Sequence, residues 1–211
     1  MVDNVYNVPM REVPLSELVQ VRSARKPEIV EEYPFMDSSP YIDIKTLETA
    51  TVSRYAVGSN FRVSDCDLVI VKDGHRSGKV FHAIDGIAAT TLAIISHNSS
   101  DIIMDYLYCY LSYRYDDFQL RKRGETVGHL DMEYLIDLRI PVPDVNIQIK
   151  VSEKYHRIEK LAKKIKMKVL QLKELSDSMR NRELKNASDN LIQQVEMMQK
   201  AWLHQIFDRI R

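Results

Sequence analysis

The chain has 211 residues, of which 45% are hydrophobic and 28% are charged, and its 30 basic side chains balance 30 acidic ones. This length suits one globular domain with an appendage. No apolar run is long enough to span a membrane and no charged-then-apolar leader follows Met1, so we expect a cytoplasmic protein without a membrane partner. The two cysteines offer neither a disulfide framework nor a metal-ligand spacing, and we expect no metal site.

The charges are distributed unevenly along the chain. Residues 1–143 carry 15 Lys and Arg against 21 Asp and Glu, a net charge of −6, whereas residues 144–211 carry 15 against 9, a net charge of +6. Because affinity for phosphates depends on positive charge, an acidic globular part is a poor general binder of nucleic acid. Nucleic-acid binding would have to rest on local basic loops, on the basic C-terminal part or on a partner.

Short strands and turns are predicted for the first hundred residues. Residues 41–44 alternate between apolar and polar side chains. Asp43 and Lys45 also have the Asp-x-Lys spacing of many metal-dependent nucleases, but no convincing second acidic residue follows a proline upstream, so a nuclease is only an alternative interpretation. Three apolar runs typical of buried strands follow, at residues 67–72, 79–81 and 90–95.

The connector between the first two apolar runs, residues 73–78, is bracketed by glycines. Gly74 and Gly78 favour a hairpin tip with positive φ angles. The segment is similar to a phosphate-binding loop, but three residues separate the glycines where four are needed, and Val80 follows Lys79 where a Ser or Thr is required. We therefore expect a tip that presents basic side chains and not a site of nucleotide hydrolysis.

An amphipathic helix is predicted from Asp101 to Leu120, because apolar and aromatic residues recur there at steps of three and four. A basic segment with two glycines follows at residues 121–129. It is either the solvated C-terminus of the helix, where cations interact favourably with the helix dipole, or a loop that contacts a ligand. A short helix at residues 130–136 and a strand at residues 138–140 complete this part.

A long helix is predicted from Val145, with Asp144 as its N-cap. From Val151 to Leu172 the apolar residues recur at alternating steps of four and three, which is the pattern of a coiled-coil seam. A helix of about 30 residues would be roughly 45 Å long. Such a helix cannot bury its seam alone, so we expect it to act as a spacer or as a handle for a partner.

A second helix is predicted after a polar stretch in which Asn186 or Ser188 is a candidate N-cap. Apolar residues recur from Leu191 to Ile210 at steps of four and three, so the segment is able to fold back antiparallel on the first helix. Trp202 lies in this stripe, where we expect it to anchor the packing.

The order of these segments resembles that of the specificity subunits of Type I restriction–modification systems, and of one target-recognition half of them. The resemblance covers roughly residues 12–172, and Gln148 follows the last proline pair at about the position that the family shows. The other segments that carry the resemblance are residues 67–74, 78–81, 88–92, 128–130 and 138–143.

The resemblance implies an α+β fold and a chain without catalytic activity. A mixed target-recognition domain, residues 1–143, would read one half of a split sequence in double-stranded DNA. An antiparallel coiled-coil region, residues 144–211, would dock DNA methyltransferase subunits. S-adenosylmethionine, ATP and Mg²⁺ would belong to those partner subunits. The sequence agrees, since it has no methyltransferase motif, no dinucleotide fingerprint and no nucleotide-binding loop.

One recognition domain stands where the family has two, which implies either a half-length subunit that pairs with itself or another chain, or a fragment. The alternative is a protein-assembly module whose helices oligomerise and which binds no DNA. We expect DNA contacts from Lys72, His75, Arg76, Ser77, Lys79, Arg121, Lys122, Arg123 and Thr126. We expect a homodimer through Ile158, Ile165, Val169, Leu172, Val195 and Trp202.

Overall fold

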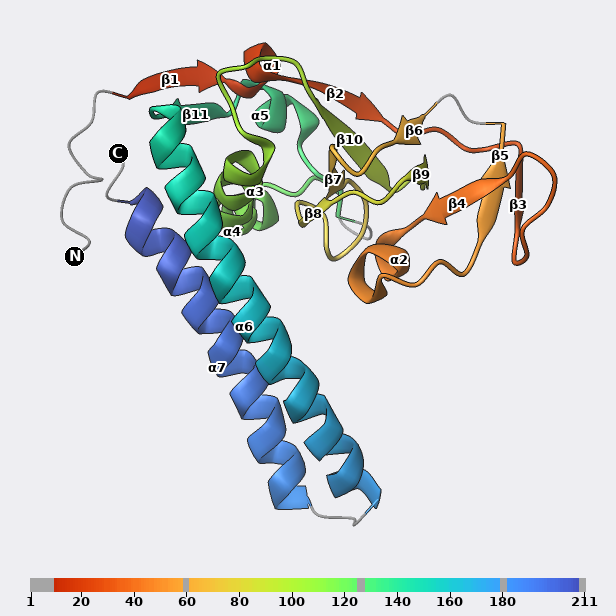
Figure 1. The fold of residues 1–211 in the computed structure, drawn as a ribbon, viewed down its shortest axis with the longest axis vertical. Helices are drawn as coiled ribbons and strands as arrows, with labels where there is room; N and C mark the ends of the chain where they lie inside the picture. Colours follow the sequence, from red (N-terminus) through yellow and green to blue (C-terminus); the bar gives the residue numbers. More distant parts are fainter. Residues whose placement is uncertain (1–9, 59–60, 125–127, 179–181, 209–211) are drawn as a thin grey trace.

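Two long helices form a stalk that projects from a mixed α/β head (Figure 1). Helix α6 spans Val145–Ser178 and α7 spans Arg182–Phe207, and the two run antiparallel. Asp144 caps α6 as predicted, because its Oδ1 accepts a hydrogen bond from the Asn146 N–H at 2.8 Å. The α+β fold with an antiparallel helical region is thus confirmed. The computed structural model describes residues 10–58, 61–124, 128–178 and 182–208.

A four-stranded antiparallel sheet lies at the centre of the head. Its strand β7 is covered on both faces, because all four of its side chains are fully buried, and this explains its uninterrupted apolar sequence. The predicted strands at residues 67–72, 79–81 and 90–95 correspond to β7, β8 and β10. In order across the sheet, the strands are β2 (Val19–Ser23), β10 (Leu92–His97), β7 (Leu68–Val71) and β8 (Val80–His82).

Two further sheets extend the head in opposite directions (Figure 1). Beside the stalk, β1 (Arg11–Pro14) pairs antiparallel with β11 (Arg139–Val142). Away from the stalk lies a five-stranded sheet in which β4 and β9 form a parallel pair. Its strands in order are β3 (Ile29–Glu31), β5 (Tyr55–Val57), β4 (Ser39–Ile42), β9 (Gly86–Ala88) and β6 (Arg62–Val63).

The helices of the head differ from the predicted ones at two places. The helix predicted from Asp101 to Leu120 is two helices, because Arg114 leaves the helical conformation at ψ 1° and its guanidinium contacts the Tyr134 hydroxyl on another helix. The strand predicted at residues 41–44 ends early, and an unpredicted helix α2 follows it. The head helices among the described residues are α1 (Leu15–Leu18), α2 (Ile44–Thr49), α3 (Met104–Tyr113), α4 (Tyr115–Leu120) and α5 (Met132–Asp137).

The second stalk helix begins earlier than predicted. Helix α7 starts at Arg182, so the polar stretch around Asn186 is helical and neither Asn186 nor Ser188 is an N-cap. Ser188 is 4% exposed and donates a hydrogen bond from its Oγ to the Leu184 carbonyl oxygen at 2.8 Å. Packing against α6 explains why this region is helical, since a small polar residue with an internal hydrogen bond fits between two helices.

The main core of the head continues into the upper half of the stalk. Val151 and Tyr155 of α6 and Phe207 of α7 belong to the same buried cluster as α3 and the central sheet. Trp202 stacks on Tyr155, with ring centroids 5.7 Å apart, which confirms it as a packing anchor within the chain.

Gln148 joins three elements at the point where the stalk leaves the head. Its side chain is 1% exposed, and its Oε1 accepts a hydrogen bond from the Ile103 N–H at 2.8 Å. Its Nε2 donates to the carbonyl oxygens of Asp101 at 2.8 Å and Pro143 at 3.0 Å. One amide therefore satisfies backbone groups before α3 and after β11. It ties these two segments to the first turns of α6.

Replacing Gln148 with Leu is expected to lower the free energy of unfolding by about 2 kcal/mol or more, because an orphaned buried polar group costs about 1–3 kcal/mol. Urea denaturation followed by circular dichroism measures this. Gln171→Leu, at an exposed position of the same helix, is the control and should change stability by less than about 0.5 kcal/mol. Equal stability of the two variants would contradict a structural role for the buried amide.

Candidate nucleic-acid interface

The two basic segments predicted to contact DNA lie side by side in the structure. The Gly74 N–H donates to the Gly128 carbonyl oxygen at 2.8 Å, and the Leu130 N–H donates to the Lys72 carbonyl oxygen at 2.7 Å. Asp73 and His129 face each other in an antiparallel bridge. Backbone pairing therefore joins residues 72–79 to residues 121–124 and 128–130 in one surface, which we call the double loop.

Side chains add further links within the double loop. The His129 Nδ1 lies 2.8 Å from the Asp73 Oδ1, and the Lys122 Nζ donates to the His75 carbonyl oxygen at 2.7 Å. Lys122 crosses Gly128 closely, since a Cβ there would come within 2.8 Å of the Lys122 Cδ and the lysine side chain would have to shift. Lys122 therefore holds the two segments together and keeps its positive charge at their junction.

The hairpin tip rests on α4. Gly78 has a φ of 90°, and a Cβ at this position would lie 2.5 Å from the Phe118 Cβ, so only glycine fits. Gln119 donates a hydrogen bond to the Ser77 carbonyl oxygen. Ser77 itself is fully buried. It thus supports the tip from below, while Arg76 and Lys79 remain partly exposed.

The cations of the tip converge on one carboxylate of α2. Glu48 pairs with the Arg76 guanidinium through Oε2, and its Oε1 lies 3.0 Å from the Lys79 Nζ. Burial raises the pKa of Glu48, but hydrogen bonds and charge from Lys79 and Arg76 outweigh this, and the net pKa is below its usual value. Glu48 is therefore ionised at neutral pH.

Arg121 and Arg123 emerge from the end of α4. The Arg121 guanidinium lies 4.4 Å from the centroid of the Tyr134 ring, in a cation–π contact. The Arg123 side chain is 61% exposed and pairs with Asp131 at 2.8 Å and Glu133 at 3.0 Å. Thr126 lies outside the described residues. The other residues that we predicted to contact DNA are described by the structure, and they lie in one region of the head.

The carboxylates of this region are the residues that sequence reasoning missed. Asp131 carries a local signal, because it caps α5 by accepting a hydrogen bond from the Tyr134 N–H at 3.1 Å. Glu48 carries none, since it lies 28 positions before Arg76 and reaches it only through the fold.

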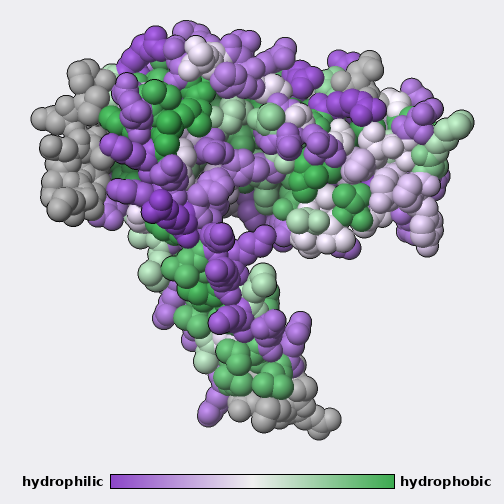
Figure 2. All heavy atoms as spheres, viewed as in Figure 1, coloured by the Kyte–Doolittle hydropathy of each residue, from purple (hydrophilic) through white to green (hydrophobic). Residues whose placement is uncertain are grey.

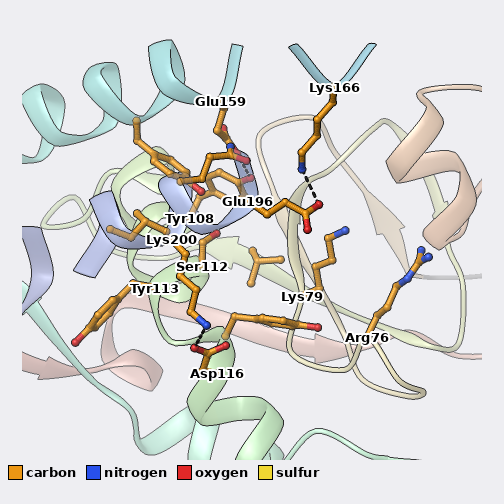
Figure 3. A pocket seen from close by; sticks show the side chains of 15 residues that line it. Arg76, Lys79, Tyr108, Ser112, Tyr113, Asp116, Glu159, Lys166, Glu196 and Lys200 are labelled. Atoms are coloured by element: carbon orange, nitrogen blue, oxygen red, sulfur yellow. Dashed lines mark hydrogen bonds and ion pairs between the residues drawn. The ribbon is translucent and has the colours of Figure 1, made fainter. Parts of the chain in front are cut away.

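A cleft of about 500 Å³ continues the double loop onto the stalk (Figure 3). Arg76 and Lys79 line it from the head, while Lys166 and Lys200 line it from the stalk. Lys166 lies 2.8 Å from Glu196, and Lys200 pairs with Asp116. Figure 2 shows hydrophilic side chains gathered where the stalk leaves the head.

Tyr108 and Glu159 also line this cleft and are paired with each other. Tyr108 donates a hydrogen bond from its hydroxyl to the Glu159 Oε1 at 2.5 Å. Burial raises the pKa of Glu159, and this hydrogen bond and the nearby His156 only partly offset it. The lining of the cleft therefore combines paired charges with tyrosine side chains.

The residues predicted to mediate self-association lie mostly inside the hairpin of the two stalk helices. Val169 is 3% exposed and Val195 is 7% exposed, and Ile158, Ile165 and Trp202 are partly buried. Leu172 is half-exposed, and further apolar side chains remain on the outside of the stalk (Figure 2). These exposed side chains include Leu161, Leu170, Leu175, Leu191, Met197 and Met198.

The predicted stripe of α7 is partly wrong. Leu191 and Met198 point away from the seam, and the buried positions of the described part of α7 are Ser188, Val195, Leu203, Ile206 and Phe207. The stripe shifts around the helix because α7 packs on α6 along its lower part and on the head along its upper part.

Asp43 has a structural role. Its Oδ1 accepts a hydrogen bond from the Thr46 N–H at 2.8 Å as the N-cap of α2, and its Oδ2 pairs with Arg54. Both oxygens that a nuclease would offer to a metal are therefore engaged. Among the described residues, no group of three metal-binding side chains is present. In the same part of the chain, no helix combines the length and apolarity needed to cross a membrane.

Comparison with known proteins gives one consistent result. The family described as Type I restriction modification DNA specificity domain matches residues 7–187. The specificity subunit of the Type I restriction enzyme MjaVIII, from Methanocaldococcus jannaschii, is 21% identical over 145 residues, which cover 67% of this chain and 34% of that protein.

Solved structures share the fold. The S subunit of a Type I restriction–modification system from M. genitalium aligns over 89% of this chain and 50% of its own length, with a TM-score of 0.57 and 11% identity. The HsdS subunit from Thermoanaerobacter tengcongensis aligns over 95% and 46%, with a TM-score of 0.59 and 15% identity.

This chain spans about half the length of those solved subunits and about a third of the curated relative. The family match extends from the head through α6 and into α7, so it includes the double loop and most of the stalk. The matched description is that of a DNA specificity domain, and not of a methyltransferase or a nuclease. The chain therefore belongs to the family of Type I restriction–modification DNA specificity proteins.

Proposed function

We propose that this chain is the non-catalytic subunit that reads one DNA half-site in a Type I restriction–modification complex. The observation that carries the proposal is the pairing of residues 72–79 with residues 121–124 and 128–130 in one basic surface, in a chain of the specificity family. DNA binding needs positive charge, but the chain as a whole is neutral and its head is acidic. The double loop supplies this charge locally, because its basic side chains lie together.

The double loop offers the groups that read base edges. Arg76 is partly exposed on a rigid tip, and the planar guanidinium of an arginine matches the O6 and N7 acceptors of guanine. Arg123 is more exposed, at the end of a helix, which suits a phosphate contact. We therefore assign base readout to Arg76 and backbone binding to Arg123.

The stalk is proposed to dock DNA methyltransferase subunits. Val145 and Ile149 of α6 are half-exposed, and Ile149 lines a cleft with Ile103 and His156 beside the head. Exposed apolar groups on a helix are typical of a protein interface. S-adenosylmethionine, ATP and Mg²⁺ would then be bound by the partner subunits, and the complex would act in the cytoplasm.

Binding to duplex DNA, measured with and without a methyltransferase subunit, separates this function from a protein-assembly module. A DNA-recognition subunit should select particular sequences from a randomised duplex pool. A protein-assembly module should bind its partner and leave the pool unselected.

Replacing Arg76 with Ala should weaken binding to the selected sequence by about 1–3 kcal/mol, because a bidentate base contact is lost. Binding to random DNA should change less. Replacing Arg123 with Ala should weaken binding to all sequences alike and reduce the dependence of log K on log salt by about one. Fluorescence anisotropy over a salt series measures both. If both variants keep wild-type affinity and selectivity, the double loop is not the recognition surface.

We further propose that the stalk pairs with the stalk of a second copy. A two-helix hairpin buries one side of each helix, and the apolar residues left outside form a surface that a four-helix arrangement would cover. Leu161 and Leu172 are eleven residues apart, which is about three turns, so they lie on the same side of α6. An isologous dimer would supply the second recognition head, related to the first by a twofold axis.

The double variant Leu161→Glu, Leu172→Glu should convert a dimer into a monomer without loss of helix, because both side chains are half-exposed in the single chain. Light scattering at micromolar concentration measures the oligomeric state, and circular dichroism measures the helix content. Gln171→Glu with Gln193→Glu adds the same charge at exposed polar positions and should leave the dimer intact.

A different result is expected for Ile165→Asp with Val169→Asp. Val169 is buried inside the hairpin, so this variant should lose helix content as well as self-association. If light scattering shows that the wild-type chain is a monomer, the proposed self-pairing is contradicted. The apolar surface of the stalk would then be covered by another subunit.

A further inference from the structure

Glu48 is the carboxylate on which two of the proposed DNA-contacting cations converge. Its Oε1 lies 3.0 Å from the Lys79 Nζ, and its Oε2 pairs with Arg76. Arg76 is also held from a second direction, since its Nε donates to the His75 Nε2 at 3.1 Å. Lys79 lies over the Phe81 ring, 4.9 Å from its centroid. Both cations therefore have a defined place on the surface before DNA binds.

Helix α2 holds Glu48 in this place. Asp43 caps its first turn, and Ala50 ends it in the left-handed conformation, with a φ of 53°. Thr46 is 1% exposed, so one face of the short helix is fixed against the head. Glu48 is thus carried on an element with both ends and one face restrained.

The ion pairs of Glu48 are not needed to hold the hairpin tip. The side chains of Arg76, Lys79 and Glu48 are 38%, 43% and 28% exposed, and ion pairs with this exposure contribute little to stability. The tip is already fixed by its backbone, since the Gly78 N–H donates to the Val71 carbonyl oxygen at 2.7 Å. The carboxylate therefore acts on the orientation and the charge of the two cations.

We propose that Glu48 is a specificity-determining positioning residue, which orients Arg76 and Lys79 toward base edges and repels phosphates from the same place. The inference rests on the proposed DNA-recognition function. A mobile arginine or lysine binds any phosphate and adds affinity without sequence information. A carboxylate beside the two cations cancels part of this general attraction and preserves the hydrogen-bonding geometry of the guanidinium. Glu48 lowers general affinity and increases discrimination between sequences.

The test compares Glu48→Gln with the wild-type full-length chain in two measurements. One is the affinity for a duplex of random sequence over a salt series, and the other is the enrichment of sequences from a randomised duplex pool. The salt dependence should steepen by about one to two, because up to two cations become available to phosphates. The affinity ratio between the best-enriched and the random duplex should fall by about tenfold.

Glu17→Gln is the matched control, because it removes the same charge from an exposed residue of α1 on another part of the head. Both measurements should remain near the wild-type values. The second control repeats Glu48→Gln in the Arg76→Ala background, where it should no longer reduce discrimination, since interacting residues are not additive. A general folding defect would reduce discrimination in both backgrounds, and circular dichroism would detect it independently.

The outcomes distinguish a failure of the role of Glu48 from a failure of the DNA-recognition function. If Arg76→Ala loses sequence preference and Glu48→Gln keeps it, the role of Glu48 is overturned and the DNA-recognition function remains. If Glu17→Gln has the same effect as Glu48→Gln, net charge explains the result and the positioning role is also overturned. If the wild-type chain enriches no sequence, the proposed function fails and this inference fails with it.

Discussion

The return of α7 into the core of the head is the constraint on which the rest of the structure depends. Phe207 is 1% exposed and meets the rings of Tyr106, Tyr110 and Tyr113 at centroid distances of 5.9, 5.2 and 5.2 Å. Burying a phenylalanine contributes about 1.5–3 kcal/mol, and each aromatic pair adds about 0.5–1.5 kcal/mol. Since α6 leaves the head beside the Gln148 joint, both ends of the hairpin are anchored, and the stalk has one direction relative to the double loop.

The double loop depends on backbone bonds more than on charge. Exposed ion pairs contribute about 0–1 kcal/mol, so the pairs of Arg76 and Lys79 add little to the stability of the tip. The backbone bonds between residues 72–74 and 128–130 are what keep the cations on one face. The carboxylates beside them are then free to shape the electrostatic field that DNA would meet. Under the proposed function, this local arrangement would decide whether the basic loop favours particular base sequences or phosphates in general.

The elements with strong periodicity could be predicted from the sequence. The strands β7, β8 and β10 and the start of α6 at Val145 follow from local apolar patterns and from the cap at Asp144. Helix α2 was missed because its capping residue, Asp43, also fits a strand or a nuclease pattern. The break at Arg114 was missed because the hydrogen bond that Arg114 makes to Tyr134 crosses 20 positions of sequence.

The sequence by itself determined the order of the strongly periodic elements, the glycine-bracketed tip at residues 73–78 and the two amphipathic helices of the stalk. The order of these segments also suggested membership of the specificity family. These features depend on residues close together in the chain, whose spacing and conformational preferences are local. Only the tertiary structure decided that the two basic segments form one surface, that Glu48 lies between Arg76 and Lys79, and which stalk side chains remain outside. Those features depend on contacts between residues tens of positions apart, and the packing of the whole chain fixes which of them meet.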